Sequence, residues 1–251
     1  MNNLMRSHWC PPPLAPRIEP GMLDIWLFSL DVAPHLAALF SGTLSADERE
    51  RASRYISEER SLEYRVCRGM LRSILARYLH AAPSGIMFRY DPWGKPAVAF
   101  PERNGIAFNL SHSGRLALLA IARDNSPGVD IERISPDICC SEIAAGEFTT
   151  REQRLFFRAR DEEQRNLFFS FWTRKEAVLK GIGKGLSIEP SEVDVADPDS
   201  GPVWETSFTP HGTWHLRDIA ADPGYAAACA YQDGIEDIRF FALGLKHGFM
   251  N

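Results

Sequence analysis

The same order of elements, helices followed by strands, is predicted twice along the 251 residues. Among the features of the sequence, this repetition restricts the possible folds most strongly. In the first half, residues 22–30 predict a strand, and Ser45 with Glu48 three positions later forms a capping box that starts a helix. Residues 58–80 carry apolar side chains at helical spacing and predict a long amphipathic helix. Short strand candidates separated by turn formers follow, up to residue 134.

The second half repeats this order. Residues 149–160 and then 162–181 have helical patterns, and strand candidates return between residues 202 and 245. Two halves of similar order predict an α+β protein of two similar α/β subdomains in a pseudo-twofold arrangement. Because small-molecule sites often lie between such units, we expect the active site in the cleft between the subdomains.

We expect three segments along the chain. Residues 1–20 are rich in proline, which blocks regular structure, and lack the apolar core of a signal peptide, so they predict a loose leader. Residues 21–138 are then the N-terminal subdomain and residues 139–251 the C-terminal subdomain. The chain is long enough for a substantial core, and the two lobes of one chain could supply the whole cleft, so we expect a monomer.

The composition excludes several classes of protein. A formal net charge of -5 argues against a general binder of nucleic acid or anionic membranes. The apolar runs are far shorter than the roughly 20 residues that span a bilayer. The five cysteines include no CxxC pair and no zinc-type spacing, which favours a reducing, cytoplasmic location.

An acid pair stands in the apolar stretch GVDIERI, residues 128–134. The residue types favour a strand, in which alternate side chains share a face, so Asp130 and Glu132 would lie roughly 7 Å apart on the same face. Two carboxylates at that distance favour a cation between them. The alternative is the solvated side of an antiparallel strand, where alternating polar residues are routine.

The second long helix carries Trp172, Glu176 and Lys180 four residues apart, which places all three on one face. Alone, this spacing also fits an ordinary i,i+4 ion pair beside a core tryptophan, worth about 0.2 to 0.5 kcal/mol. The glycines that follow do not form a nucleotide-binding fingerprint, because both known fingerprints follow a strand and this stretch follows a helix.

Several residues are suited to binding anions. Ser111 and His112 end a strand candidate and can both donate to phosphate oxygens, although turn residues also bond to their own backbone. Arg65 and Arg68 belong to a stripe on the long helix, which is either a phosphate contact or a solvated face. Lys95 stands in a turn between glycine and proline and offers a compact charge.

Four motifs, taken in order, resemble those of the Sfp-type 4'-phosphopantetheinyl transferases. They are WGKP, FNLSHS, GVDIE and FWTRKEAVLKGIGKGL, which fall between residues 93 and 186. The family pattern G-[IV]-D-[IV]-E followed by W-x-x-K-E-[AS]-x-x-K is matched at every fixed position. The resemblance implies two similar α/β subdomains with coenzyme A and Mg²⁺ in the cleft between them.

The resemblance also implies roles for individual residues. Asp130, Glu132 and Glu176 would be the magnesium ligands, and three acids suit that ion. Lys180 would contact the coenzyme A phosphates, and Lys175 would lie beside the pyrophosphate. The adenosine end with its 3'-phosphate would be held by Lys95, Ser111 and His112.

The other basic positions match the family less closely. Arg51 falls where the family has a basic residue early in the chain, and Arg65 and Arg68 are weaker matches. Glu48 stands where many members have a second lysine, which puts that contact in doubt. Glu152 matches a family acid, but Thr149 and Glu152 also form a capping box.

The implied reaction is attack by a serine hydroxyl of an acyl, peptidyl or aryl carrier protein on the β-phosphorus of coenzyme A, releasing 3',5'-ADP. Lys180 would stabilise the leaving group, and Glu176 is the candidate base or a metal ligand. Two alternatives are a coenzyme A or nucleotide binding protein without transferase activity and a magnesium-dependent pyrophosphate hydrolase. Neither alternative needs a carrier protein.

Overall fold

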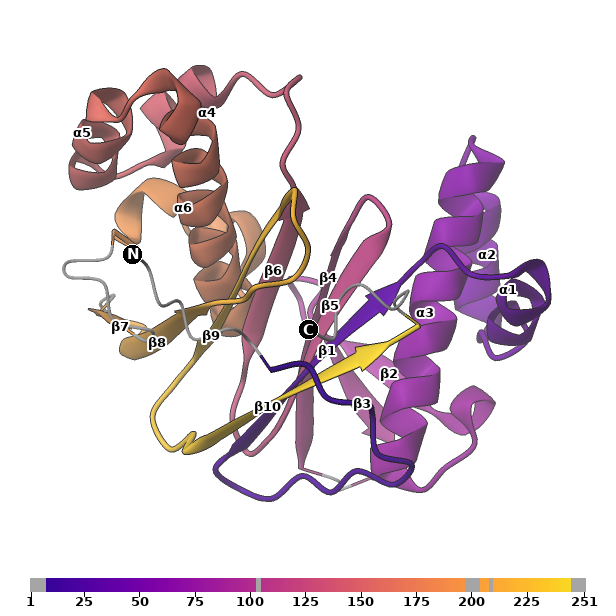
Figure 1. Cartoon of the computed structure of the whole chain (residues 1–251). Helices are drawn as coiled ribbons and strands as arrows, with labels where there is room; N and C mark the ends of the chain where they lie inside the picture. Colours follow the sequence, from indigo (N-terminus) through magenta and orange to yellow (C-terminus); the bar gives the residue numbers. More distant parts are fainter. Residues whose placement is uncertain (1–7, 103–104, 197–203, 208–209, 245–251) are drawn as a thin grey trace.

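A computed structural model describes residues 8–102, 105–196, 204–207 and 210–244. It contains two four-stranded sheets that pack face to face, with helices on their outer faces (Figure 1). The predicted α+β class is confirmed. A separate two-stranded hairpin is formed by β2 (Met87–Tyr90) and β3 (Pro96–Phe100).

The first sheet has the strand order β10-β1-β5-β4. Strand β1 is paired in parallel with β10 and antiparallel with β5, and β5 is antiparallel with β4. The strands are β1 (Met22–Ser29), β4 (Ile106–Ser113), β5 (Leu116–Arg123) and β10 (Asp237–Leu243).

The second sheet has the order β6-β9-β8-β7, and its pairs are all antiparallel. Its strands are β6 (Gly128–Arg133), β7 (Trp204–Ser207), β8 (Thr213–Asp218) and β9 (Tyr225–Tyr231). Part of the predicted strand near residue 202 lies outside the described residues, so only β7 itself is placed.

The helices flank the sheets. The first group is α1 (Pro34–Ser41), α2 (Ala46–Ser53) and α3 (Glu58–Leu79), and the second is α4 (Cys140–Glu147), α5 (Thr150–Arg158) and α6 (Asp161–Ile182). The patterns predict α2, α3, α5 and α6, and the structure confirms them. Helices α1 and α4 were not predicted, because each is only eight residues long and, unlike α2, does not begin with a capping box.

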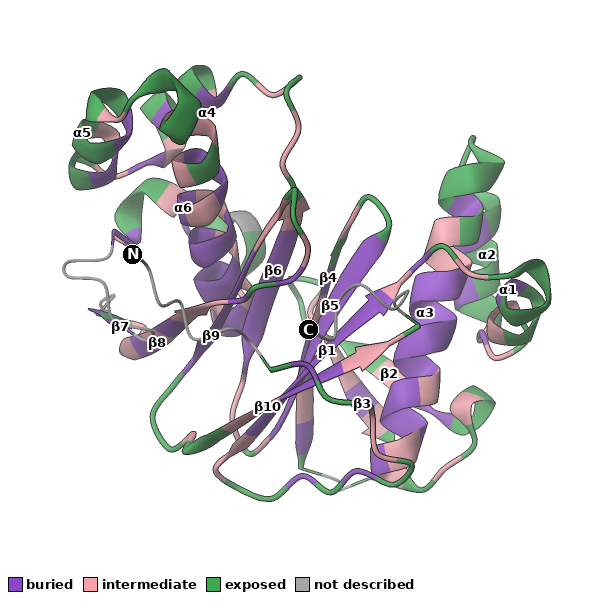
Figure 2. Ribbon diagram, viewed as in Figure 1, coloured by how far each residue is buried: buried purple, intermediate pink, exposed green. Residues whose placement is uncertain are grey.

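Three apolar clusters fill the spaces between these layers. One lies between α3 and the first sheet, a second between α6 and the second sheet, and a third between the two sheets (Figure 2). Strand β1 is buried on both faces: Trp26 and Phe28 face α3, whereas Ile25 and Leu27 face the second sheet. Double burial explains why the strand is almost uniformly apolar.

The strand order is repeated between the sheets. The order β1-β5-β4 in the first half corresponds to β6-β9-β8 in the second, with antiparallel pairing throughout. The twofold relation itself stays a prediction. The second sheet begins with β6, at Gly128, so it begins before the expected subdomain boundary at residue 138. The last strand, β10, returns to the first sheet and pairs with β1.

The proline-rich leader is packed from residue 8 onward, which corrects the expectation of a loose segment. Cys10 forms a parallel bridge with Phe241 of β10, and Ile18 is buried in the cluster between α3 and the first sheet. Trp9 is 8% exposed, packs edge-on against Phe240 and donates its Nε1 proton to the Ala220 carbonyl at 2.8 Å. Backbone pairing and buried side chains therefore replace the regular structure that proline prevents.

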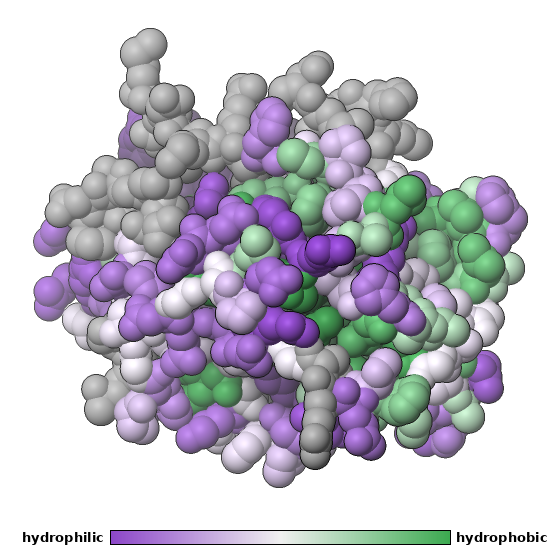
Figure 3. Space-filling view, turned by 90° about the horizontal axis from the view of Figure 1, so that it is seen from below, coloured by the Kyte–Doolittle hydropathy of each residue, from purple (hydrophilic) through white to green (hydrophobic). Residues whose placement is uncertain are grey.

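The exterior is mixed in character. Seen from below, hydrophilic residues cover much of the surface, and hydrophobic residues gather on the side where α1 to α3 lie (Figure 3). All five cysteines are free thiols. Among the described residues, no helix combines the length and apolar character needed to cross a membrane.

Candidate active site

The two acids of GVDIERI point across the junction between the sheets, toward β4. Ser111 Oγ donates to Asp130 Oδ1 at 2.7 Å, and Ser113 Oγ donates to Glu132 Oε2 at 2.6 Å. Ile131, between the acids, is fully buried in the cluster between the sheets. The prediction that the acids share one face of a strand is therefore confirmed, and the opposite face of β6 is core.

Lys180 lies among these acids. Its Nζ is 2.6 Å from Asp130 Oδ1, 3.9 Å from Glu176 Oε2 and 3.2 Å from Ser111 Oγ. Burial opposes the positive charge, but Asp130 and then Glu176 raise the pKa of Lys180 above its ordinary value. The ammonium group is therefore charged at neutral pH and partly neutralises the cluster.

The two glutamates of the cluster hold their protons more tightly than exposed carboxyls. Burial raises the pKa of Glu176, and Asp130 and Glu132 add to the effect while Lys180 opposes it. Burial also raises the pKa of Glu132, against the hydrogen bond from Ser113. Asp130 of β6 and Glu176 of α6 thus contact one ammonium group, and Glu132 is near enough for its charge to act on the pKa of Lys180.

A cavity of about 640 Å³ opens beside this cluster. Trp172, Glu176 and Lys180 all line it, which confirms that the four-residue spacing on α6 places them on one face. Both halves of the chain contribute to its walls. The lining residues are Trp93, Gly94, Lys95, Pro96, Asn109, Glu147, Trp172, Glu176, Leu179, Lys180, Gly183, Gly185, Ile188, Glu189 and Pro190.

Lys95 reaches this cavity from the turn between β2 and β3. Its Nζ donates to the Gly181 carbonyl at 2.7 Å and to Ser126 Oγ at 2.8 Å. Burial lowers the pKa of Lys95 to about 8. The side chain therefore carries a charge that is held at the cavity wall and that titrates just above neutral pH.

Ser111 and His112 point in different directions, as neighbours on a strand must. Ser111 is buried and its hydroxyl donates to Asp130, which argues against the expected contact with an adenosine phosphate; that contact stays a prediction. His112 is exposed on the other side of β4. Desolvation lowers the pKa of His112, while Glu63 opposes this shift and Lys180 adds to it.

Lys175 does not line the cavity, which corrects the expected place beside a pyrophosphate. Its side chain has no exposed surface, and its Nζ lies 2.7 Å from Glu152 Oε2 inside the second lobe. It also donates to the carbonyls of Pro190 and Val193, at 2.8 and 2.5 Å. Glu152 also completes the capping box with Thr149 and accepts from the Val195 amide, so the ion pair of Lys175 and Glu152 is held by α5 and the loop near Val195.

Arg65 and Arg68 are also held by carboxylates, which argues against the expected phosphate contacts. Arg65 is paired with Glu58 on the surface of α3. Arg68 is 9% exposed and lies 2.7 Å from Glu48, which also binds the buried Arg72. Burial raises and the two arginines lower the pKa of Glu48, with the net effect downward. Glu48 thus takes part in a buried ion network rather than replacing a ligand-binding lysine.

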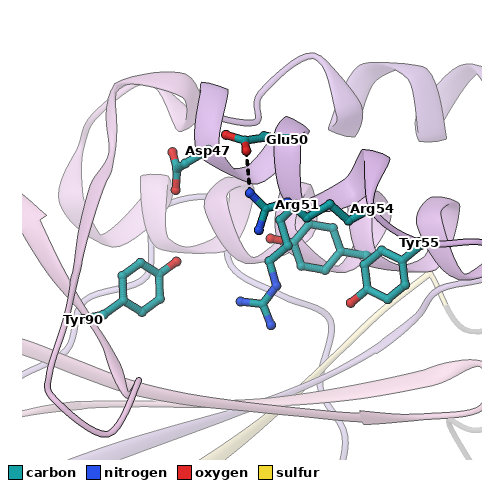
Figure 4. Close-up of a pocket in the computed structure, with 7 residues that line it drawn as sticks. Asp47, Glu50, Arg51, Arg54, Tyr55 and Tyr90 are labelled. Carbon is teal, nitrogen blue, oxygen red and sulfur yellow. Dashed lines mark hydrogen bonds and ion pairs between the residues drawn. The ribbon is translucent and has the colours of Figure 1, made fainter.

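Arg51 lines a second cavity, of about 570 Å³, on α2, α3 and the end of β2 (Figure 4). Its guanidinium lies 5.7 Å from the centre of the Tyr64 ring. Three tyrosines and two arginines project into this hollow, together with two acids of α2. They are Tyr55, Tyr64, Tyr90, Arg51, Arg54, Asp47 and Glu50.

Comparison with known proteins decides the family. Residues 126–230 match the 4'-phosphopantetheinyl transferase superfamily, and residues 34–124 match the 4'-phosphopantetheinyl transferase N-terminal family. The chain is 33% identical over 229 residues to the 4'-phosphopantetheinyl transferase HetI of Nostoc sp., covering 90% of this chain and 94% of HetI. The chain belongs to the 4'-phosphopantetheinyl transferase family.

Two other members of this family are similar over most of their length. The 4'-phosphopantetheinyl transferase Sfp of Bacillus subtilis is 31% identical over 202 residues, covering 79% of this chain and 88% of Sfp. The L-aminoadipate-semialdehyde dehydrogenase-phosphopantetheinyl transferase of Mus musculus is 28% identical over 239 residues, covering 85% of this chain and 76% of that protein. The two family matches meet between β5 and β6, where the strand order begins to repeat.

The acid cluster of this transferase family member fits a hard divalent cation in its donor chemistry. Asp130 Oδ2 is buried without a hydrogen-bond partner, so one carboxylate oxygen is left for another ligand. Within the part of the chain that the structure describes, no three acidic, histidine or cysteine side chains already form a metal-binding group. Mg²⁺ commonly takes one or two carboxylates and completes its shell with substrate phosphates and water, so such a closed group is not required.

Sequence patterns did not identify the tyrosines of the second cavity. Tyr64 lies on α3 and Tyr90 at the end of β2, and only the fold brings them to Arg51 and Arg54. The usable signal is the spacing of the two arginines, which at i and i+3 share a helix face. Asn109 is a further missed residue: its side-chain oxygen accepts from the Val129 amide at 2.9 Å and joins β4 to β6.

Proposed function

We propose that this chain transfers the 4'-phosphopantetheine group of coenzyme A to a serine of an acyl, peptidyl or aryl carrier protein, releasing 3',5'-ADP. The observation that carries the proposal is the convergence of Asp130, Glu132, Glu176 and Lys180 at the edge of a cavity with walls from both lobes. Family membership supplies the reaction class.

Coenzyme A is an extended anion, and the basic groups near the cluster suit its phosphates. Lys180 would contact the pyrophosphate, because it is partly exposed and lies among the acids. Lys95 adds a second charge at the same cavity. Arg51 suits the adenosine 3'-phosphate, since a guanidinium can form two parallel hydrogen bonds to a phosphate group. The neighbouring tyrosine rings could stack on the purine.

The chemistry requires one proton acceptor and stabilisation of one leaving group. As the oxygen of the carrier serine bonds to the β-phosphorus, its proton passes to Glu176, whose raised pKa makes the carboxylate a better base. The bond between the β-phosphorus and the bridging oxygen breaks, and the charge that develops on 3',5'-ADP is stabilised by Lys180. Trp172, Leu179 and Ile188 add apolar surface to the cavity beside these groups.

Asp130, Glu132 and Glu176 would hold Mg²⁺. When bound, the ion would neutralise charge on the pyrophosphate oxygens. The orphaned Asp130 Oδ2 supports this part of the proposal. Lys180 donates to the other oxygen of Asp130, Oδ1, so this carboxylate would be shared between the ammonium group and the ion.

The cellular location and the oligomeric state of the protein are further parts of this proposal. Five free thiols are typical of a reducing compartment, so we propose that the enzyme acts in the cytoplasm. We propose a monomer, because one chain supplies both walls of the cavity.

The test is the intact mass of apo carrier proteins after incubation with this chain, coenzyme A and Mg²⁺. A phosphopantetheine-sized gain on the carrier, lost with EDTA and in Glu176→Ala, would support the transferase and its need for metal. No gain on fatty-acid, polyketide and peptide carriers, with coenzyme A still bound, would contradict it. Release of 3',5'-ADP without any carrier would instead indicate a hydrolase.

A further inference from the structure

Ser113 makes two hydrogen bonds that fix the direction of its hydroxyl proton. Ser113 Oγ accepts from the backbone amide of Arg133 at 3.1 Å. Its single proton is donated to Glu132 Oε2 at 2.6 Å. Because a serine hydroxyl has one proton, and the amide can only donate, the hydroxyl is oriented by the protein as a donor to this carboxylate.

This hydrogen bond crosses the boundary between the two sheets. Ser113 is the last residue of β4 in the first sheet, and Glu132 lies near the end of β6 in the second. Two residues earlier, Ser111 and Asp130 form the same contact. Alternate residues of β4 thus bind alternate residues of β6, although the strands share no backbone ladder.

We infer that Ser113 is a positioning residue that holds Glu132 for a divalent cation, an inference that rests on the metal site of the proposed function. A glutamate side chain has several freely rotating bonds, and ordering them costs entropy when a ligand binds. The hydroxyl of Ser113 fixes one oxygen in advance. Among the described residues the other oxygen, Oε1, accepts no hydrogen bond and so is left for a ligand.

Ser111 cannot serve this purpose in the same way. Its oxygen also accepts from Lys180 Nζ, so its environment changes when that ammonium group moves. Ser113 instead bonds only to the backbone and to Glu132 among the described residues. It therefore offers a support for the carboxylate that does not depend on Lys180.

The experiment compares Ser113→Thr with Ser113→Val in the full chain. The two replacements have nearly the same shape and differ in the hydroxyl, so steric effects on folding are shared. Mn²⁺ replaces Mg²⁺ as the probe, and free Mn²⁺ is measured by electron paramagnetic resonance, with and without coenzyme A. Because removal of outer contacts to metal ligands costs 10- to 100-fold in affinity, we expect Ser113→Val to raise the Mn²⁺ Kd by about tenfold.

Ser113→Thr should retain nearly the wild-type Kd, because its hydroxyl can make the same bond. Ser113→Ala is a second variant without the hydroxyl, and it serves if the added methyl groups disturb the fold. Equal Kd values for the wild type, Ser113→Val and Ser113→Ala would overturn the inference, and so would a wild-type Kd for Glu132→Gln, because Glu132 would then not be a ligand. Absence of Mn²⁺ binding to the wild type would overturn it together with the metal site, while the carrier mass assay would still decide the transferase reaction.

Discussion

Lys175 Nζ lies 2.7 Å from Glu152 Oε2, and neither side chain has any exposed surface. The lysine is five positions before Lys180 in the same motif, yet the two have different surroundings. Lys180 faces the cavity and the acid cluster, whereas Lys175 points into the second lobe between α5 and the loop near Val193. One lysine of the motif thus faces the cavity, and the other is buried in an ion pair.

Removal of Lys175 should therefore unfold the protein rather than only disable it. Lys175→Ala leaves Glu152 buried without its charge partner, and we expect the free energy of unfolding to fall by about 3 to 5 kcal/mol. The double variant Glu152→Gln with Lys175→Met should recover part of this loss, since no unpaired charge remains. Urea unfolding of the three proteins measures the effect. Normal stability of Lys175→Ala with loss of coenzyme A binding would assign it to the ligand instead.

Substitution of Lys180 should lower the rate of the transfer reaction and leave the stability of the protein largely unchanged. We expect Lys180→Ala to lower the transfer rate by about 10² to 10³, the usual loss when a donor to developing negative charge is removed. Lys180→Arg keeps a charge at the cavity and should lose less. The rates are measured from the mass of a carrier protein over time, together with melting curves. A wild-type rate for Lys180→Ala would exclude the role of this lysine in stabilising the leaving group.

Local patterns were sufficient for the acid cluster. Strand alternation placed Asp130 and Glu132 on one face, and helical spacing placed Glu176 and Lys180 together, because both periodicities are properties of the backbone. The roles of Arg65 and Arg68 could not be obtained this way. A stripe on a helix does not reveal which face is buried, and the partner of Arg68, Glu48, comes from another helix.

The pairing of strands that lie far apart in the chain could not be predicted from the sequence either. The pairing of β10 with β1 joins the last described strand to the first, and no local signal specifies such a partner. The same pairing explains the leader, which adds to the outer side of β10 through Cys10. Residues 8–20 contain no helix and no regular strand, as their prolines predict, but a proline-rich segment can still pack when its other side chains, such as Trp9, are apolar.

The pH dependence of coenzyme A use should report Lys95. Because burial lowers its pKa from 10.5 to about 8, the ammonium is present below pH 8 and is lost as the pH rises through that value. We therefore expect kcat/KM for coenzyme A to fall above about pH 8. In Lys95→Arg this decline should move to higher pH, because guanidinium stays charged. If kcat/KM still declines above about pH 8 in Lys95→Met, the decline is caused by the titration of a group other than Lys95.

The leader offers a test of folding that is separate from catalysis. Trp9 is nearly buried against Phe240, in the cluster that joins the two sheets, whereas Leu14 in the same segment is 92% exposed. Truncation of a buried tryptophan to alanine typically costs about 3 to 5 kcal/mol, and we expect the lower part of that range because Trp9 lies at the edge of the cluster. Leu14→Ala is the matched control and should leave the free energy of unfolding within about 0.5 kcal/mol of the wild type. Denaturant unfolding measures both variants. Equal stability of Trp9→Ala and Leu14→Ala would show that the segment contributes nothing to the fold. A loss of stability confined to Trp9→Ala would show that Trp9 stabilises the fold through its contacts with Phe240 of β10 and with Ala220.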